Sequence, residues 1–486
     1  MNPIPLAVLT PIAFAFTLPL IGKLSKSVAK AYAVLGTFLT MLFTFEVFKS
    51  SGSGPLTYTF GGWRAPIGIV YEVDTMSAFL GLVTSTLLFL IAIYSLEYIK
   101  SGEVWYFTLY LGLEAGLIGV LYTGDLFNLF VMLEVTSVAA YALVMFNRDL
   151  QSLRAGLKYA FIGAIGTTLY FIAMGLLYRT YGTLNMAQLA EIVHSSDVVN
   201  ASLAILLLAT WAFLIKAAIF PNHFWLPDAH PAAPSPISAV LSGLVVNVGI
   251  YSIARLYFTL YSGLPEVKSL GTLLIILGAI SAFLGAIMMN VHSDIKRIIA
   301  YSTIMHMGYL SMALGIGSSL ALASAVFHTF NHAVAKSLLF LSAGIMIQIG
   351  GSRDLRDLAG IGRTNPLAMF SFAVAALSLA GIPPLNVFSS KVMLFTAFLD
   401  WNPALAGVLI VTSIMSLVAY VKMMRVLWLG CGKKESVGMP VMTGVVVAIS
   451  IAVIVLGLVG PWIFKGIALP AVAQGWESYV AGGLGG

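Results

Sequence analysis

Eight ionisable side chains lie within long apolar stretches of this 486-residue sequence: Glu114, Glu134, Lys216, His306, His328, His332, Lys336 and Lys391. Carboxyl, amine and imidazole groups can each take up and release a proton. An ionisable residue at the centre of a membrane helix costs roughly 2.5–3.5 kcal/mol, so those that occur usually face a polar cavity and have a function. The set therefore indicates a polar relay through an apolar interior.

Two of these charges are Glu134, in the segment DLFNLFVMLEVTSVAAYALVMF, and Lys216, in WAFLIKAAIF. We predict that they are partners, because a carboxylate near a lysine favours the charged form of both groups. The alternative is that Glu134 is a neutral carboxylic acid, hydrogen-bonded to a neighbouring helix.

A proline at position 221 follows Lys216 closely. Pro221 lacks the backbone donor that would reach residue 217 and clashes with the preceding turn, so we expect the helix to be interrupted just after Lys216. Irregular backbone at membrane depth is tolerated only where it is buried in protein or lines a wet cavity, and broken helices are typical of ion-translocating sites. The alternative is a kinked helix whose lysine extends to the membrane surface.

The same pattern recurs in the segment SLAGIPPLNVFSSKVMLFTAF, where Pro383 and Pro384 precede Lys391 by about two helical turns. The lysine comes before the break in the first segment and after the break in the second. This order is what an inverted repeat of one broken-helix unit would give.

Between the two breaks, the segment FHTFNHAVAKS places His328, His332 and Lys336 at intervals of four residues, so they share one helix face. A zinc enzyme with this spacing would also need a glutamate that is missing here, and Lys336 would repel a metal cation. We therefore predict no metal, and we interpret the face as part of a proton or water wire because histidine titrates near neutrality. His306 could connect to that wire, although a single histidine is more often a packing residue.

The composition identifies the elements that hold these residues as membrane helices. The chain is 59% hydrophobic and 9% charged, whereas soluble domains carry about 25% charged residues. Its single cysteine excludes an iron–sulfur cluster or a thiolate zinc site, so we predict no cofactor. The N-terminus lacks the basic region of a secretory signal and is interpreted as the first helix.

Apolar stretches of about 20 residues, enough to cross a bilayer, predict fourteen helices in a single membrane domain covering residues 1–486. They lie at residues 3–22, 28–48, 75–98, 105–122, 125–146, 155–179, 202–221, 236–260, 269–290, 297–316, 319–349, 366–399, 404–428 and 440–464. The stretches 319–349 and 366–399 are too long for simple spans, so each is expected to be bent or broken.

Basic residues gather in the connections that follow odd-numbered helices, such as Lys23, Arg148, Lys296 and Arg353. This asymmetry predicts that those connections are cytoplasmic and that both termini lie on the outer side of a cell membrane. The longest polar insertion, at about residues 50–74, is expected to form a small external hairpin.

Five segments resemble a known family: GDLFNLFVMLE, LIKAAIFPNHFWLPDAHPAAPSPISAVLSG, RIIAYSTIMHMGY, FHTFNHAVAKSLLFLSAG and GIPPLNVFSSK. They are similar to the antiporter-like membrane subunits shared by Mrp cation/proton antiporters (the D-type component in particular), respiratory complex I and membrane-bound hydrogenase-type complexes. The resemblance runs from about residue 70 to 430.

The resemblance implies an all-α fold of fourteen helices, with helices seven and twelve broken. Helices one to three (residues 3–98) would precede two inverted five-helix repeats, at residues 105–260 and 269–428, and helix fourteen (residues 440–464) would follow. A polar axis along the membrane midplane is also implied.

The resemblance further implies roles for the ionisable residues in ion translocation. Glu134 and Lys216 would form the charge pair of one half-channel. His328, His332 and Lys336 would form the central relay, and Lys391 would be the terminal lysine.

Two positions depart from the family pattern. The family usually has a lysine or histidine on helix eight, where this chain has Asn247, which can hydrogen-bond water but cannot carry a proton charge. Alternatively, Asn247 only joins two helices by a hydrogen bond. Glu114 is an additional acid that the pattern does not require, and it either adds a cation ligand or is paired locally.

These observations predict a subunit that translocates protons, sodium ions or both inside a multisubunit plasma-membrane complex. Its partners would be other membrane subunits and not nucleic acid, and it would have no redox or catalytic centre of its own. One alternative is a stand-alone secondary transporter for an organic solute, which the even distribution of charges disfavours. Another is an intramembrane enzyme using His328 and His332, which the lack of a nucleophile or metal constellation disfavours.

Overall fold

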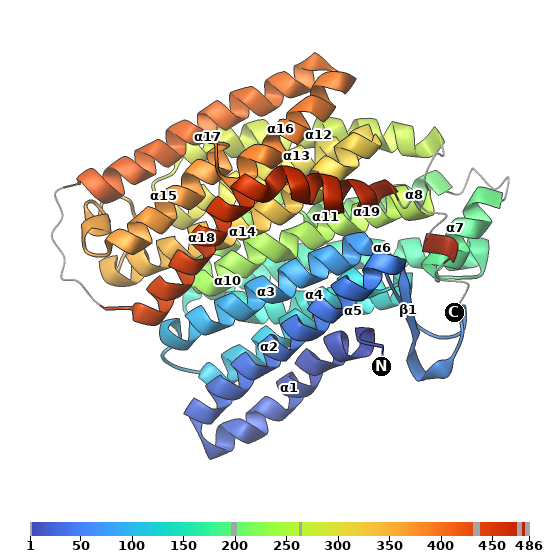
Figure 1. The fold of residues 1–486 in the computed structure, drawn as a ribbon, viewed down its shortest axis with the longest axis horizontal. Coiled ribbons are helices and arrows are strands. Elements are labelled where there is room, and N and C mark those ends of the chain that lie inside the picture. The colour runs from blue at the N-terminus through green and yellow to red at the C-terminus, as the bar shows by residue number, and fades with distance from the viewer. Residues whose placement is uncertain (1, 196–201, 262–264, 431–437, 474–478, 482–486) are drawn as a thin grey trace.

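Long apolar helices that run roughly side by side build most of this computed structural model, which describes residues 2–195, 202–261, 265–430, 438–473 and 479–481 (Figure 1). Within these residues, eleven helical segments have the length and hydropathy to cross a membrane. They are α1 (Ile4–Leu24), α2 (Lys26–Ser50), α3 (Thr75–Tyr98), α4 (Glu103–Tyr122), α5 (Leu126–Val144), α6 (Leu150–Tyr181), the run Ser235–Leu260, α12 (Pro265–Val291), α14 (Ser319–Gly350), α17 (Pro403–Leu429) and α18 (Pro440–Ile463) with its extension to Val472. The protein is therefore a multi-pass helical membrane protein.

Further helices complete the fold. They are α7 (Met186–Ser195), α8 (Ser202–Lys216), α9 (Leu226–Ala232), α13 (Ile295–Ile316), α15 (Pro366–Ala380), α16 (Asn386–Trp401) and α19 (Leu469–Ala473). The predicted hairpin is also present: β1 (Leu56–Thr59) pairs with β2 (Val70–Val73) in antiparallel register, with Thr57 opposite Glu72. It lies at the same end of the bundle as α7 (Figure 1).

Side-chain caps determine where several helices begin. The carboxylates of Asp125, Asp149 and Asp294 accept hydrogen bonds from the backbone N–H groups three residues later, at the starts of α5, α6 and α13. Such caps satisfy donors that the first helical turn leaves unpaired. These three aspartates thus determine the starts of helices that carry polar residues of the interior.

Glycine allows α12 and α13 to pack in close contact. A Cβ atom on Gly278 would lie 2.6 Å from the carbonyl oxygen of Gly308, and one on Gly308 would lie 2.4 Å from the carbonyl oxygen of Gly278. Any larger residue at either position would force the two backbones apart. Because His306 is two residues before Gly308, this contact fixes its position in the bundle.

The structure has both predicted helix interruptions. Helix α8 ends at Lys216, and helical structure resumes with a 3₁₀ turn at Asn222–Trp225 and then α9. Helix α15 ends at Ala380, and α16 begins at Asn386. We expected residues 319–349 to be bent or broken. They are not broken, because α14 is one continuous helix of 32 residues, longer than a simple span.

The run Ser235–Leu260 contains π-helical turns that the sequence did not predict. Helix α10 (Ser235–Val240) is followed by a π-helical segment at Leu241–Val245, then by α11 (Val246–Ala254) and a second π-helical segment at Arg255–Leu260. Such turns often occur at functional sites because they shift side chains relative to a regular helix.

The basic connections gather at one end of the bundle. Arg353 lies 3.4 Å from the carboxylate of Asp294 and donates to the side-chain oxygen of Gln151 at 2.9 Å, so it joins three connections. Lys296 was expected to be a cation of an exposed connection. Instead it is buried and donates to the carbonyl oxygen of Ala233 at 2.7 Å.

Candidate functional site

Seven of the eight ionisable residues found in apolar segments are buried, and Glu134 is half-buried. They come from α4, α5, α8, α13, α14 and α16, elements that are far apart in the chain. Hydroxyl groups and helix carbonyl oxygens hold the lysines among them.

Lys216 turns inward at the end of α8. Its ammonium donates to the hydroxyl of Ser137 at 2.6 Å and lies 3.5 Å from the hydroxyl of Tyr141, both on α5. The lysine therefore does not extend to the membrane surface, and the proline kink with a surface lysine is ruled out for this structure.

Glu134 shares the α5 face with Ser137 and Tyr141, since the three are spaced three and four residues apart. Its carboxylate is beyond ion-pair distance from Lys216, and its buried Oε1 has no hydrogen-bond partner among the described residues. It is near enough to act electrostatically on the ammonium. The expected direct pair is therefore a separated one, with Ser137 as the group that contacts Lys216.

The break after Lys216 is stabilised by local hydrogen bonds. The indole N–H of Trp225 donates to the carbonyl oxygen of Ile215 at 3.0 Å, and the backbone N–H of Phe220 donates to Ser281 Oγ at 2.9 Å. Ala218 adopts a left-handed conformation with φ of 52°, which is unfavourable for a residue with a Cβ atom. The interruption is thus a turn with defined hydrogen bonds and not a frayed helix end.

The three histidines from the apolar segments form one cluster. His306 Nδ1 and His328 Nε2 are 3.0 Å apart, and His328 Nδ1 is 2.9 Å from Ser390 Oγ on α16. The ring centroid of His332 lies 5.1 Å from that of His306, and neither of its ring nitrogens has a partner in the described part of the chain. His306, a weak candidate in the sequence, is the residue that joins the other two.

Lys336 continues this cluster along α14. Its ammonium donates to the carbonyl oxygen of Ile299 at 3.1 Å and contacts the hydroxyl of Ser302, both on α13. It is fully buried one turn beyond His332. The four-residue spacing therefore does place the two histidines and the lysine on one interior face of α14.

Lys391 lies on the other side of the histidine cluster. Its ammonium donates to the carbonyl oxygen of Ala380 at 3.1 Å and to Ser413 Oγ on α17 at 2.9 Å. It also lies 5.7 Å from the ring centre of Tyr309, whose ring contacts His306 edge-on. Lys391 is thus linked to the histidines both through Tyr309 and through its neighbour Ser390.

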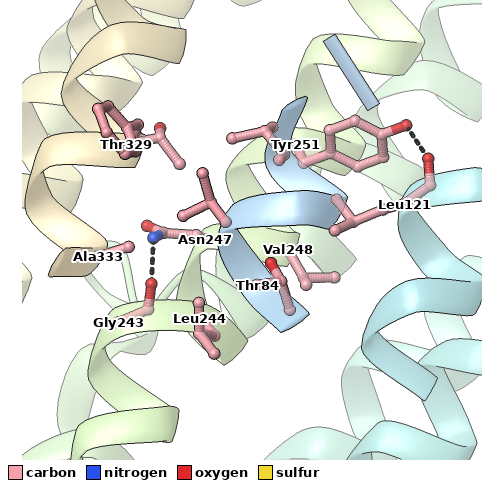
Figure 2. Close-up of a pocket in the computed structure, with 12 residues that line it drawn as sticks. Thr84, Leu121, Gly243, Leu244, Asn247, Val248, Tyr251, Thr329 and Ala333 are labelled. Atoms are coloured by element: carbon pink, nitrogen blue, oxygen red, sulfur yellow. Dashed lines mark hydrogen bonds between the residues drawn. The ribbon is translucent and has the colours of Figure 1, made fainter. Parts of the chain in front are cut away.

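Asn247 lines a small, partly open pocket between α11, α3 and α14 (Figure 2). Its amide nitrogen donates to the carbonyl oxygen of Gly243 at 2.6 Å, within its own helical run. This bond does not join two helices, contrary to the alternative proposed for this residue.

The cavity beside Asn247 has a volume of about 20 Å³, and Thr84, Thr329 and Tyr251 contribute to its lining. That volume is enough for about one water molecule. Asn247 Oδ1 is buried without a hydrogen-bond partner among the described residues, so it is available to a water there.

Glu114 lies apart from these contacts. It is fully buried on α4, and neither carboxylate oxygen has a hydrogen-bond partner among the described residues. The structure therefore does not show the local pairing that the sequence left open.

The structure also contains buried charged and titratable groups that the sequence did not single out. His230, in the apolar-flanked segment DAHPAA, stacks on Phe340 with 4.8 Å between ring centres. Arg255 makes a two-pronged ion pair with Asp74, both contacts at 2.6 Å. Burial acts to raise the pKa of Asp74, but the Arg255 guanidinium and Ser77 hold it below its ordinary value. The sequence does not predict this ion pair, because Asp74 and Arg255 lie at the ends of two separate apolar segments.

Groups that accept and donate protons therefore succeed one another across the interior. One ring nitrogen of His328 contacts His306 and the other contacts the hydroxyl of Ser390, which allows a proton to pass by exchange of donor and acceptor. The lysines are held by neutral oxygens, so their charge can change without breaking a tight ion pair. Such an arrangement suits proton transfer or the movement of a small cation.

Comparisons with known proteins give one result. The family described as NADH:quinone oxidoreductase/Mrp antiporter, transmembrane region, matches residues 123–416. The D-type component of the Na(+)/H(+) antiporter of Alkalihalophilus pseudofirmus is 33% identical over 81% of this chain and 80% of that protein. The N-type component of the NADH-quinone oxidoreductase of Desulforudis audaxviator is 32% identical over 86% and 85%.

A solved structure has the same fold over nearly the whole chain. A chain of the membrane-bound sulfane sulfur reductase, an archaeal respiratory membrane complex, superposes with a TM-score of 0.94. The sequences are 29% identical, and the match covers 99% of this chain and 100% of that one.

Proposed function

Because this chain belongs to the NADH:quinone oxidoreductase/Mrp antiporter family, we propose that it translocates protons, sodium ions or both along its buried polar residues, as a D-like member of a multisubunit membrane complex. One observation carries the proposal. Six ammonium and imidazole groups of the proposed path are buried: those of Lys216, His306, His328, His332, Lys336 and Lys391. Hydroxyls or helix carbonyls contact the three lysines and His328, and the rings of His306 and His332 lie against His328.

The histidine cluster is the part best suited to proton transfer. The Ser390 hydroxyl can pass its proton to His328 only while its oxygen takes up a replacement proton from water. His328 must then release its other ring proton to His306, because a neutral imidazole holds one. Neither ring nitrogen of His332 has a partner among the described residues, so the one that carries no hydrogen is free to accept a proton from a hydrated proton nearby. A charged Lys336 one turn away opposes a positive charge on His332, so the charge of the lysine can control the step.

Asn247 fits this scheme as a water site without charge of its own. The residue lines a pocket of about 20 Å³ between α11 and α14, and its Oδ1 has no hydrogen-bond partner among the described residues. A water held there would conduct a proton but would not store it. Transfer past α11 would therefore be governed by Lys216 and Lys336.

The finer architecture belongs to the same proposal. Fourteen spans result if the pairs α8–α9 and α15–α16 and the helix α13 each count as one crossing beside the eleven long segments. The opposite placement of the lysines around the two breaks supports two inverted repeats. The basic connections at one end of the bundle support a cytoplasmic position for that end, with both termini outside the plasma membrane.

The partners follow from the complexes of its relatives. Those relatives are named as subunits of a sodium/proton antiporter and of a quinone oxidoreductase, and the similar solved chain comes from a respiratory complex. We therefore assign this chain other membrane subunits as partners and no redox centre of its own. A redox or antiport module would supply the driving energy.

Transport by membrane vesicles tests the proposal. Vesicles containing the complex with Glu134→Gln or Lys216→Ala should show strongly reduced proton- or sodium-coupled activity, while native gels show a normally assembled complex. Unchanged transport in both variants would reject the assignment. Purification of a lone chain with full transport activity would instead support a stand-alone transporter.

A further inference from the structure

An open basic pocket lies at the end of the bundle that carries the basic connections, away from the polar residues of the interior. Its volume is about 430 Å³, and its lining residues are Leu150, Gln151, Arg154, Ala155, Lys158, Asp228 and Arg297. They come from the first turns of α6, from α9 and from the start of α13. Nothing in the proposed ion path uses this pocket.

The charges of the pocket do not cancel. Asp228 is its one acid, and its two oxygens are taken by Lys158 at 2.6 Å and by Arg297 at 3.0 Å. Arg154 is exposed and has no ion pair within the described part of the chain. Three basic groups against one carboxylate leave an excess of two positive charges, and a guanidinium is well shaped for phosphate oxygens.

An exposed apolar surface begins next to the pocket. On α6, Leu157, Phe161 and Ile165 follow at intervals of four residues, with exposed fractions of 53%, 73% and 53%. Leu157 is three residues from Arg154, so the apolar row and the basic row lie side by side on the helix. The row leads from the end of the helix towards its middle, where the membrane hydrocarbon would be.

We propose that this pocket binds the phosphate headgroup of an anionic phospholipid, whose acyl chains lie along the exposed row of α6. A basic pocket next to an apolar row favours a lipid over free phosphate, because free phosphate has no acyl chains to contact the row. Basic pockets between membrane helices on the cytoplasmic side suit such headgroups. The site does not depend on the ion path, and its binding can be measured without transport.

A bound headgroup would hold together the elements around the first break. Lys158 and Asp228 connect α6 to α9, and the neighbouring Tyr159 stacks on Trp225 with 4.0 Å between ring centres. Trp225 in turn hydrogen-bonds the end of α8. The lipid would therefore act on the segment that follows Lys216 without touching the lysine itself.

The test compares two arginine variants of the whole complex. Arg154→Gln removes the unpaired cation of the pocket, and Arg425→Gln removes an exposed arginine of α17 that does not line it. Binding is measured by native mass spectrometry with added phosphatidylglycerol or phosphatidylcholine. Because a lysine or arginine near an anionic lipid surface contributes about 1 kcal/mol, Arg154→Gln should weaken phosphatidylglycerol binding about fivefold.

Arg425→Gln should leave the affinity unchanged, and phosphatidylcholine should bind equally weakly to all forms. Equal losses in both variants would show a general surface-charge effect and overturn the proposal. Displacement by inorganic phosphate at matched concentration would also overturn it, by showing a simple anion site.

Photo-crosslinking of the unmodified complex gives a second measurement that needs no variant. A photoreactive phosphatidylglycerol should label the start of α6 and α9. Absence of label there, or a zero-length crosslink from the Lys158 region to an acidic residue of another subunit, would identify the pocket as a subunit contact and overturn the lipid site.

Discussion

The two interrupted helices hold their lysines in different ways. At the first break, Lys216 is the last residue of α8, and hydroxyls of another helix contact its ammonium. At the second break, Lys391 follows the interruption and reaches back to the carbonyl oxygen of Ala380, the end of α15. The lysine at the first break is therefore held by a neighbouring helix, whereas the lysine at the second break satisfies a backbone carbonyl of the interrupted helix itself.

The two lysines also differ in whether an acidic side chain is near them. Glu134 acts on Lys216 from the same α5 face as Ser137. Lys391 has no carboxylate within ion-pair distance among the described residues, and its further contact is the ring of Tyr309. An acid can therefore tune the charge of Lys216, while Lys391 depends on burial, on neutral oxygens and on the histidine cluster next to it.

The turns themselves are also built differently. Gly381 ends α15 with φ of 91°, a conformation suited to glycine, whereas Ala218 adopts φ of 52° at the first break with a Cβ atom present. The carbonyl of Ile215 is satisfied by an indole N–H from Trp225. Two turns that look alike in sequence thus rely on different residues for their geometry.

The largest expected effect is loss of transport when either lysine is removed. Lys216→Ala and Lys391→Ala should each lower ion flux in vesicles at least about tenfold, equivalent to about 1.4 kcal/mol in the limiting barrier. Only Lys216 should be coupled to Glu134. In thermal unfolding of the complex, Glu134→Gln and Lys216→Ala should be non-additive by about 0.5–3 kcal/mol, while Glu134→Gln and Lys391→Ala should add. Additive effects in both pairs would remove the electrostatic difference between the two breaks.

Substitution of the glycine at the second break should come next in size. Gly381→Ala places a Cβ atom 2.9 Å from Lys391 Cδ and imposes a left-handed alanine, so it should destabilise the complex by about 1–3 kcal/mol and lower transport. Gly175→Ala, inside α6 with open space at its Cβ position, is the matched control and should be neutral or slightly stabilising. Equal effects of the two changes would mean that the turn at Gly381 tolerates other residues.

Removal of one hydroxyl at each lysine should have a larger effect at Lys216 than at Lys391. Ser137→Ala takes away the shortest contact of Lys216, and hydrogen bonds to charged groups contribute about 1.5–3 kcal/mol. Ser413→Ala should have a smaller effect, because the carbonyl of Ala380 still holds Lys391. Ion flux as a function of pH measures both variants. A larger shift of the profile in Ser413→Ala would reverse the proposed order.

The smallest expected effect concerns the turn after Lys216. Trp225→Phe keeps an aromatic ring against Tyr159 but removes the N–H donor to Ile215, so it should cost about 0.5–1.5 kcal/mol of stability. The thermal transition of the purified complex reports the change. No change in that transition, with flux also normal, would show that the indole hydrogen bond does not support the break.

Much of the fold could be predicted because each signal is local. Pro221, Pro383 and Pro384 cannot continue a regular helix, and both interruptions are present where these residues fall. The hairpin and the shared α14 face of His328, His332 and Lys336 likewise follow from turn composition and from helical periodicity. The length of 319–349 was a poor guide to a break, because a continuous 32-residue helix is possible where the ends extend beyond a simple span.

The partners of these residues could not be predicted, because they come from other helices. Ser137, Ser302 and Ser413 are common residues in membrane helices, and only packing shows that each contacts a lysine. His306 is a lone histidine in sequence, and its contact with His328 depends on the packing of α13 against α14. Arg255 and Asp74 are separated by 180 residues of intervening chain and pair only in three dimensions.

Lys336 lies between the two breaks, so its substitution is the decisive test of an ion path through the interior. Lys336→Ala should abolish proton- and sodium-coupled flux in vesicles while native gels show full assembly, and Arg425→Gln should leave both unchanged. The reason is that the ammonium of Lys336 contacts α13 one turn beyond His332, next to the histidine cluster. Normal flux in an assembled Lys336→Ala complex would contradict the claim that ions move along the buried polar residues.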